Sequence, residues 1–172
     1  MKSVALLVRL KIPDVTALTA ANALRRSMGY AQLRELRRAD YYRLDLQVET
    51  EAEAVALAQE LADKTNLFVN PNKHIYEVVT TRAAAAPGAG QVAQVLVTDP
   101  HDGSAEGMLA ALQGRLGYGD RISGLTKGLL WTLLLDVADA AEARRLAAEM
   151  AETKSLEQGL LVNPHFQEFE VW

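Results

Sequence analysis

Residues 70–78 read NPNKHIYEV, and residues 163–171 read NPHFQEFEV. Both stretches begin with Asn-Pro and continue, after four variable residues, with an aromatic residue followed by Glu-Val. Asn-Pro favours a turn, and the residues that follow it favour a strand. A motif that recurs after 93 residues predicts that the 172-residue chain contains two copies of one module.

Other short motifs recur with nearly the same separation. Gly29-Tyr30 returns as Gly117-Tyr118, 88 residues later, each time at the end of a helical pattern. The helix start at 50–53 returns at 139–142, 89 residues later. The growing separation predicts two small insertions in the second copy, the larger one near residues 155–159.

These recurrences predict a module at residues 1–80, a linker at 81–91 and a second module at 92–172. The linker is rich in Ala, Pro and Gly, and as a coil it would reach roughly 20 Å.

Periodicity predicts the elements of each module. In the first module we expect strands at 4–10, 33–38, 41–48 and 75–79 and helices at 17–28 and 50–61. In the second we expect strands at 92–97, 131–137 and 166–172 and helices at 105–116 and 140–150. The order strand, helix, strand, strand, helix, strand is typical of a ferredoxin-like α+β fold, with both helices on one face of an antiparallel sheet.

Composition narrows the class of protein. The chain has no cysteine, which excludes disulfides, thiolate chemistry and cysteine-ligated zinc. The first module carries 11 basic and 10 acidic residues, whereas the second carries 6 and 12, which suggests that the two halves face different partners. We expect no nucleic-acid partner and no membrane span. Because the N-terminus enters a strand pattern directly, we expect a cytoplasmic protein.

No set of residues predicts catalysis by this chain alone. His74, His101 and His165 have no second ligand at helical spacing, and no nucleophile stands with a base. The glycine-rich segment 87–90 lacks the Lys-Ser/Thr of a phosphate loop. We therefore predict no catalytic residue, no metal site and no cofactor.

Two groups of residues are candidates for a partner interface. The basic residues Arg34, Arg37, Arg38 and Arg43 could dock an acidic partner, or they could be ordinary solvated turn charges. Leu130 and Leu134 place apolar side chains on both sides of a strand whose helices would cover one side. A second module, another chain or a larger subunit could cover the other side. A monomer with an open sheet is the alternative.

The combined motifs resemble the PurS family, the small accessory subunit of phosphoribosylformylglycinamidine synthase in purine biosynthesis. The resemblance covers nearly all of both modules, and its motif residues are Lys11, Gly29, Tyr30, Asn70, Pro71, Gly117, Tyr118, Gly128, Asn163 and Pro164. Gly128 matches the glycine of a family turn, whose counterpart in the first module is Ala39.

The resemblance implies an accessory role. PurS-like modules pair edge to edge and bridge the catalytic synthetase subunit, an ATP-dependent ligase, and the glutaminase subunit. The resemblance therefore implies that this chain is a covalent pseudo-dimer that binds both subunits, supports ammonia transfer and forms homo-oligomers through sheet edges or faces.

Other functions remain open from the sequence. Tandem ferredoxin-like modules also serve as small-molecule-sensing or regulatory modules, which is the main alternative. An RNA-binding sheet is disfavoured because the exposed strand positions lack paired aromatic residues.

Overall fold

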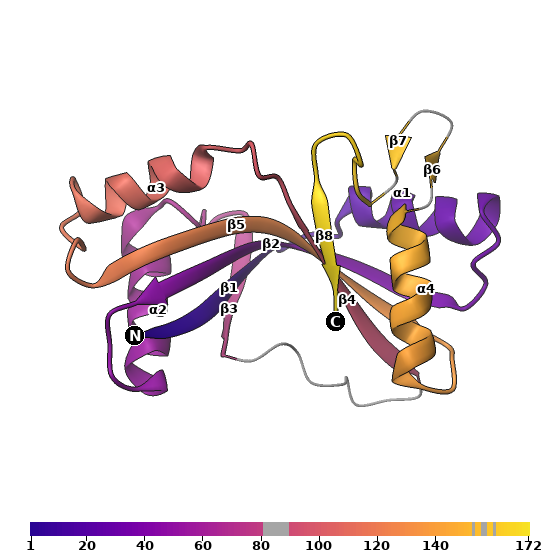
Figure 1. The fold of residues 1–172 in the computed structure, drawn as a ribbon, viewed down its shortest axis with the longest axis horizontal. Coiled ribbons are helices and arrows are strands. Elements are labelled where there is room, and N and C mark those ends of the chain that lie inside the picture. Colours follow the sequence, from indigo (N-terminus) through magenta and orange to yellow (C-terminus); the bar gives the residue numbers. More distant parts are fainter. Residues whose placement is uncertain (81–89, 153, 156–157, 160) are drawn as a thin grey trace. The chain divides into compact units, whose positions relative to one another are not determined.

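The computed structural model describes residues 1–80, 90–152, 154–155, 158–159 and 161–172 (Figure 1). Its elements in chain order are β1 (Lys2–Leu10), α1 (Val15–Asn22), the π-helical turn η1 (Ala23–Ser27), β2 (Leu33–Leu46), α2 (Glu51–Thr65), β3 (His74–Val79), β4 (Gln91–Thr98), α3 (Ser104–Gln113), β5 (Ile122–Leu135), α4 (Ala140–Glu152), β6 (Lys154–Ser155), β7 (Gln158–Gly159) and β8 (Glu168–Val171). Residues 81–89 of the predicted linker lie outside the described residues, as does part of the predicted insertion at 155–159.

The main sheet has the hydrogen-bonded strand order β3-β1-β2-β5-β4-β8. The strand pairs are antiparallel, with Leu6 opposite both Tyr42 of β2 and Val78 of β3. In the same way, Val95 of β4 lies opposite Trp131 of β5 and Val171 of β8. The predicted α+β class and the antiparallel sheet are confirmed.

One detail of the predicted strand order is wrong. Residues 33–38 and 41–48 do not form two strands, because β2 runs without interruption from Leu33 to Leu46. Positions 39 and 40 are Ala and Asp, so no glycine or proline breaks the strand there. The pairing of β2 with β1 extends as far as Asp40, which lies opposite Val8. β5 is equally long, so each half of the chain contributes three strands to the main sheet, with helical structure after each of the first two.

The described chain forms two compact units, and each takes segments from both halves of the sequence. Unit 1 comprises Met1–Ile12, Asp40–Ala83 and Asp102–Gly128, whereas unit 2 comprises Pro13–Ala39, Ala84–His101 and Leu129–Trp172. Thus α1, from the first half, belongs to unit 2, and α3, from the second half, belongs to unit 1. The modules 1–80 and 92–172 describe a recurrence in sequence and stay a prediction.

The core of unit 1 lies between its strands and the helices α2 and α3 (Figure 1). Alternate residues of β1, such as Leu6 and Val8, face Leu57 and Leu61 of α2. Leu112 of α3 completes this cluster and is fully buried. Both helices therefore cover the same face of the strands, as the periodicity predicts.

The core of unit 2 repeats this arrangement with α1, η1 and α4. Ala21 and Leu24 of the first half pack with Val95, Leu133 and Leu146 of the second half. The predicted apolar stripe of the first helix is therefore buried, but in a core whose strands and second helix come largely from the second half. The alanine-rich face of α1 permits close approach of the helix to the strands.

The predicted helix start at 50–53 forms a capping box at the N-terminus of α2. The Thr50 hydroxyl accepts from the Glu53 backbone N–H, and the Glu53 carboxylate accepts from the Thr50 N–H. These backbone bonds, with that of Glu49, lower the pKa of Glu53. The helix therefore begins where the sequence predicts.

Candidate functional site

A glycine with a left-handed backbone follows the first helix of each half. Gly29 and Gly117 have φ angles of 79° and 78°, which lie in the left-handed region. A side chain at either position would meet no atom within 4 Å, so backbone conformation alone favours glycine. The two family-motif glycines thus have the same physical role.

The tyrosine after each glycine reaches across to a helix from the opposite half. The Tyr30 hydroxyl donates to Glu149 Oε1 of α4 at 3.1 Å. The Tyr118 hydroxyl donates to Glu60 Oε1 of α2 at 3.0 Å. The sequence analysis did not identify the two glutamates, although their separation of 89 residues equals that of the helix starts.

A second pair of contacts recurs at the start of each first helix. The Asp14 carboxylate caps α1 by accepting from two backbone N–H groups and is bound by Arg38 at 2.8 and 3.2 Å. The Asp102 carboxylate accepts from the Ser104 backbone N–H and lies 3.3 Å from Lys127 Nζ. These bonds, above all those from Ser104, lower the pKa of Asp102. Each helix start is thereby tied to one of the two long strands.

The two Asn-Pro turns have the same hydrogen bonds. The Asn70 N–H donates to His74 Nδ1 at 3.1 Å, and the Asn163 N–H donates to Gln167 Oε1 at 2.8 Å. In both turns the asparagine side chain accepts from the backbone two residues later, at 3.0 and 3.1 Å. The predicted turns are confirmed, and histidine and glutamine fill the same structural role.

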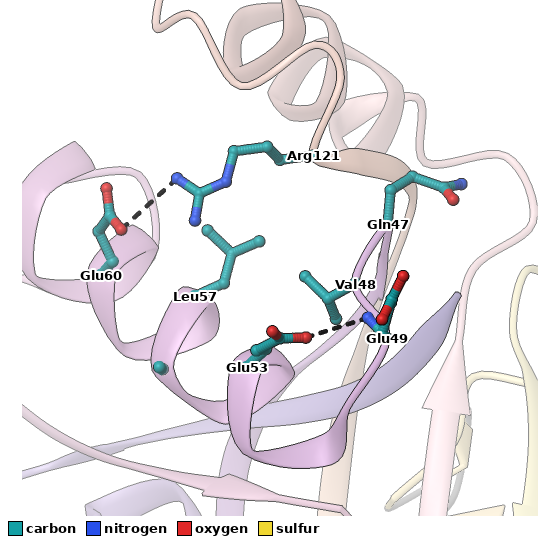
Figure 2. Close-up of a pocket in the computed structure, with 8 residues that line it drawn as sticks. Gln47, Val48, Glu49, Glu53, Leu57, Glu60 and Arg121 are labelled. Carbon is teal, nitrogen blue, oxygen red and sulfur yellow. Dashed lines mark hydrogen bonds and ion pairs between the residues drawn. The ribbon is translucent and has the colours of Figure 1, made fainter.

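A pocket of about 420 Å³ opens beside α2 in unit 1 (Figure 2). Arg121 extends above Leu57 toward Glu60, and Glu53 turns toward the backbone of Glu49. The pocket is lined by Gln47, Val48, Glu49, Glu53, Ala56, Leu57, Glu60 and Arg121.

Glu60 is the most heavily engaged carboxylate of this pocket. It lies 3.6 Å from both Arg121 and Lys64, in addition to its bond with Tyr118. The Tyr118 hydrogen bond is the main cause that lowers the pKa of Glu60, and the two cations add to it. An ionised Glu60 with three partners is suited to holding α2 to Tyr118 and Arg121. Its lowered pKa is the opposite of what a general acid at neutral pH needs.

Most arginines of the candidate docking cluster have carboxylate partners within the chain. Arg37 binds Glu35 at 2.7 and 3.1 Å, which lowers the pKa of Glu35. Arg43 lies 3.1 Å from Asp45. Arg38 binds the helix cap described above, and its guanidinium lies 5.9 Å from the Trp131 ring centroid. Arg34 has an interaction of its own. The cluster is therefore not a row of free cations.

The remaining predicted residues lie in varied surroundings. Leu130 is buried and Leu134 is half-buried within the chain itself. Lys11 donates to the Pro71 carbonyl oxygen and so joins the end of β1 to the first Asn-Pro turn. Gly128 does not form a turn, because β5 continues through it.

Neither a metal-binding cluster nor a membrane-spanning helix occurs among the described residues. No group of three or more His, Asp or Glu residues in this part of the chain is placed to hold a metal ion. None of its helices is both long and apolar enough to cross a membrane. The recurring feature is instead a set of structural contacts between the two halves.

Comparison with known proteins finds a family model that matches the first half of the chain. Residues 3–82 match the model of the PurS family, described as phosphoribosylformylglycinamidine (FGAM) synthase. No curated protein matches the chain. The matched segment includes Lys11, Gly29, Tyr30 and the Asn70-Pro71 turn. Residues 3–82 of the chain are therefore similar to the PurS family.

Proposed function

We propose that this chain is a non-catalytic accessory subunit of phosphoribosylformylglycinamidine synthase in de novo purine biosynthesis. It would bridge the synthetase and glutaminase subunits and support ammonia transfer between them. The family match over residues 3–82 carries the proposal. The described contacts agree with it, because the Gly-Tyr and Asn-Pro motif residues hold turns and helix ends in place. The proposal includes a cytoplasmic location.

We also propose that the chain is a tandem pseudo-dimer. Similar contacts recur in the two units: two Gly-Tyr corners (Gly29-Tyr30 and Gly117-Tyr118), an aspartate paired to a basic residue at each first-helix start, and two Asn-Pro turns. Each unit takes its first helix from the opposite half of the chain, as two exchanged copies would. One chain would thus provide both modules of a pair, in place of two separate small subunits.

The proposed partner surface is the exposed basic side of β2. The side chains of Arg37 and Arg43 are 61% and 52% exposed, so their ion pairs with Glu35 and Asp45 are open to solvent and individually weak. An acidic partner could exchange these carboxylates for its own at little cost. Additional copies of the chain could pair through the edges of β3 or β8, which end the strand order.

Co-purification of the full chain with the synthetase and glutaminase subunits of its own organism tests the proposal. We expect a stable ternary complex by size-exclusion chromatography with mass measurement, and purine-dependent growth after deletion of the gene. Normal growth without purines, together with no complex, would refute the accessory role.

Charge reversal tests the proposed surface. Arg37→Glu with Arg43→Glu should weaken the complex, most strongly at low salt, because screening reduces surface attraction. Arg144→Glu with Arg145→Glu is the matched control, since both arginines are exposed on α4 and Arg145 is also ion-paired, to Glu149 at 3.1 Å. Equal weakening by both changes would assign the effect to net charge and remove the β2 surface from the proposal.

A further inference from the structure

The two Asn-Pro turns each border a pocket, and these twin pockets differ in chemistry. In unit 1 the pocket has a volume of about 380 Å³ and is lined by Lys11, Ala62, Asp63, Asn66, Val69, Pro71, His74, Ile75 and Tyr76. In unit 2 the pocket has about 440 Å³ and is lined by Ala151, Glu152, Val162, Pro164, Gln167 and Phe169. Five lining positions of the second pocket have a counterpart of the same or a similar type in the first, but its lining contains no cation.

The second pocket shows which groups the fold itself needs. Gln167 accepts the same backbone hydrogen bond as His74, so an amide side chain is sufficient to hold the turn. Phe169 fills the place of Tyr76 without a hydroxyl group. The imidazole, the phenol and Lys11 of unit 1 are therefore polar groups beyond what the turn requires.

These extra groups give the unit 1 pocket a side that donates hydrogen bonds. Lys11 is held at the end of β1 by its bond to the Pro71 carbonyl, which leaves other ammonium protons available. Because His74 Nδ1 accepts from the Asn70 N–H, the neutral ring carries its proton on Nε2. Two fixed donors on adjacent strands suit a carboxylate.

The opposite side of the pocket attracts positive charge. Asp63 lies in the last turn of α2, where the backbone carbonyl groups give the helix end a partial negative charge. The Tyr76 hydroxyl donates to Asp63 Oδ1 at 2.8 Å and leaves Oδ2 as an acceptor. Burial, with Asp63 nearby, raises the pKa of Tyr76 to about 12, so the phenol stays a donor at neutral pH.

We infer that the pocket beside the first Asn-Pro turn binds a small α-amino acid. Lys11 and His74 would hold its carboxylate, Asp63 its ammonium group, and Ile75 with Val69 would face its aliphatic side chain. The volume lies in the range of small-molecule sites, roughly 300–1,000 Å³. This site is independent of the proposed assembly role, and it gives the ligand-sensing alternative a definite location.

Calorimetric titration of the full chain with L-norvaline tests the inference, with pentanoate and butylamine as half-ligands. Pentanoate lacks the ammonium group and butylamine lacks the carboxylate. Norvaline should bind. The affinity of each half-ligand should be lower by a factor of about ten or more, because one set of charge-assisted hydrogen bonds is lost. No binding of norvaline, or equal binding of pentanoate, would overturn the inference.

Three variants assign the contacts. Lys11→Met and His74→Gln should each weaken the binding of both norvaline and pentanoate. Asp63→Asn should weaken the binding of norvaline and butylamine and leave the binding of pentanoate unchanged. His74→Gln keeps the turn bond that Gln167 makes in unit 2, so this variant should fold. The matched control is Glu152→Gln in the twin pocket, which should leave norvaline binding unchanged. Wild-type affinity in all three unit 1 variants would overturn the site.

Discussion

In unit 2 the Tyr30 hydroxyl meets Glu149, and in unit 1 the Tyr118 hydroxyl meets Glu60. The hydrogen bond is the same, but its surroundings differ. In unit 1 Glu60 also has Arg121 and Lys64 within ion-pair distance, whereas in unit 2 Glu149 has the Arg145 of its own helix. The contacts that join opposite halves are retained, while the charges around them vary. The two units therefore share this contact between opposite halves of the chain but differ in the charged side chains around it.

The largest expected effect tests the exchange itself. Leu24→Ala should cost about 2–5 kcal/mol, because the side chain is fully buried. Since Leu24 belongs to the core of unit 2, hydrogen exchange should rise in α4 and β4. Leu112→Ala should instead raise exchange in α2 and β1. The reverse pattern, with each variant loosening its own half of the sequence, would contradict the exchanged cores.

The next test compares the two Gly-Tyr corners. Gly29→Ala and Gly117→Ala should each destabilise the protein by about 1–2 kcal/mol, because alanine is strained at positive φ. Gly103→Ala is the control, since Gly103 has a φ of −68° and open space around it. Urea unfolding measures all three. A loss at only one corner would show that the two corners are not equivalent.

A smaller difference should separate the two ion pairs at the first-helix starts, Arg38–Asp14 and Lys127–Asp102. Arg38→Ala should cost about 1 kcal/mol, because Arg38 binds Asp14 through two nitrogens and lies over Trp131. Lys127→Ala should cost less, since the Lys127–Asp102 pair is more exposed. Thermal unfolding of the single variants and of each double variant with its aspartate would measure both couplings. Equal coupling energies would remove the distinction.

The smallest effect concerns acid stability. The folded-state pKa of Glu60 is lowered, so its contribution is present above the unfolded-state pKa and is lost as pH falls through the folded-state pKa. Glu60→Gln should therefore be less stable than wild type at neutral pH, and the difference should vanish in acid. Tyr118→Phe should narrow this pH dependence, because Tyr118 is the main cause of the shift. A difference that persists unchanged in acid would exclude the linkage.

The sequence predicted local structure well where one short motif sets it. The capping box at Thr50 and Glu53, the end of the first helix at Gly29 and both Asn-Pro turns are confirmed. Each of these features depends on residues within a few positions of one another, so a short stretch of sequence is enough to predict it.

Two features depended on distant residues and were not predicted. The apolar face of α1 indicates burial, but nothing in its spacing tells which strands it meets. The carboxylates that bind Tyr30 and Tyr118 are 119 and 58 residues away in sequence. The single strand β2 was missed because an aspartate at position 40 weakened the strand pattern, while pairing with β1 carries the strand through it.

The mixed origin of the cores also affects how the protein can be made. The core of unit 1 includes α3, and unit 2 includes α4 and β8. Neither core can therefore be completely packed while the ribosome is still synthesising the first half of the chain. During synthesis the apolar face of α1 stays uncovered until the second half of the chain is made, which favours chaperone binding and slow folding through long-range contacts. For the same reason, a recombinant fragment cut at the end of the family match would lack α3 and should self-associate.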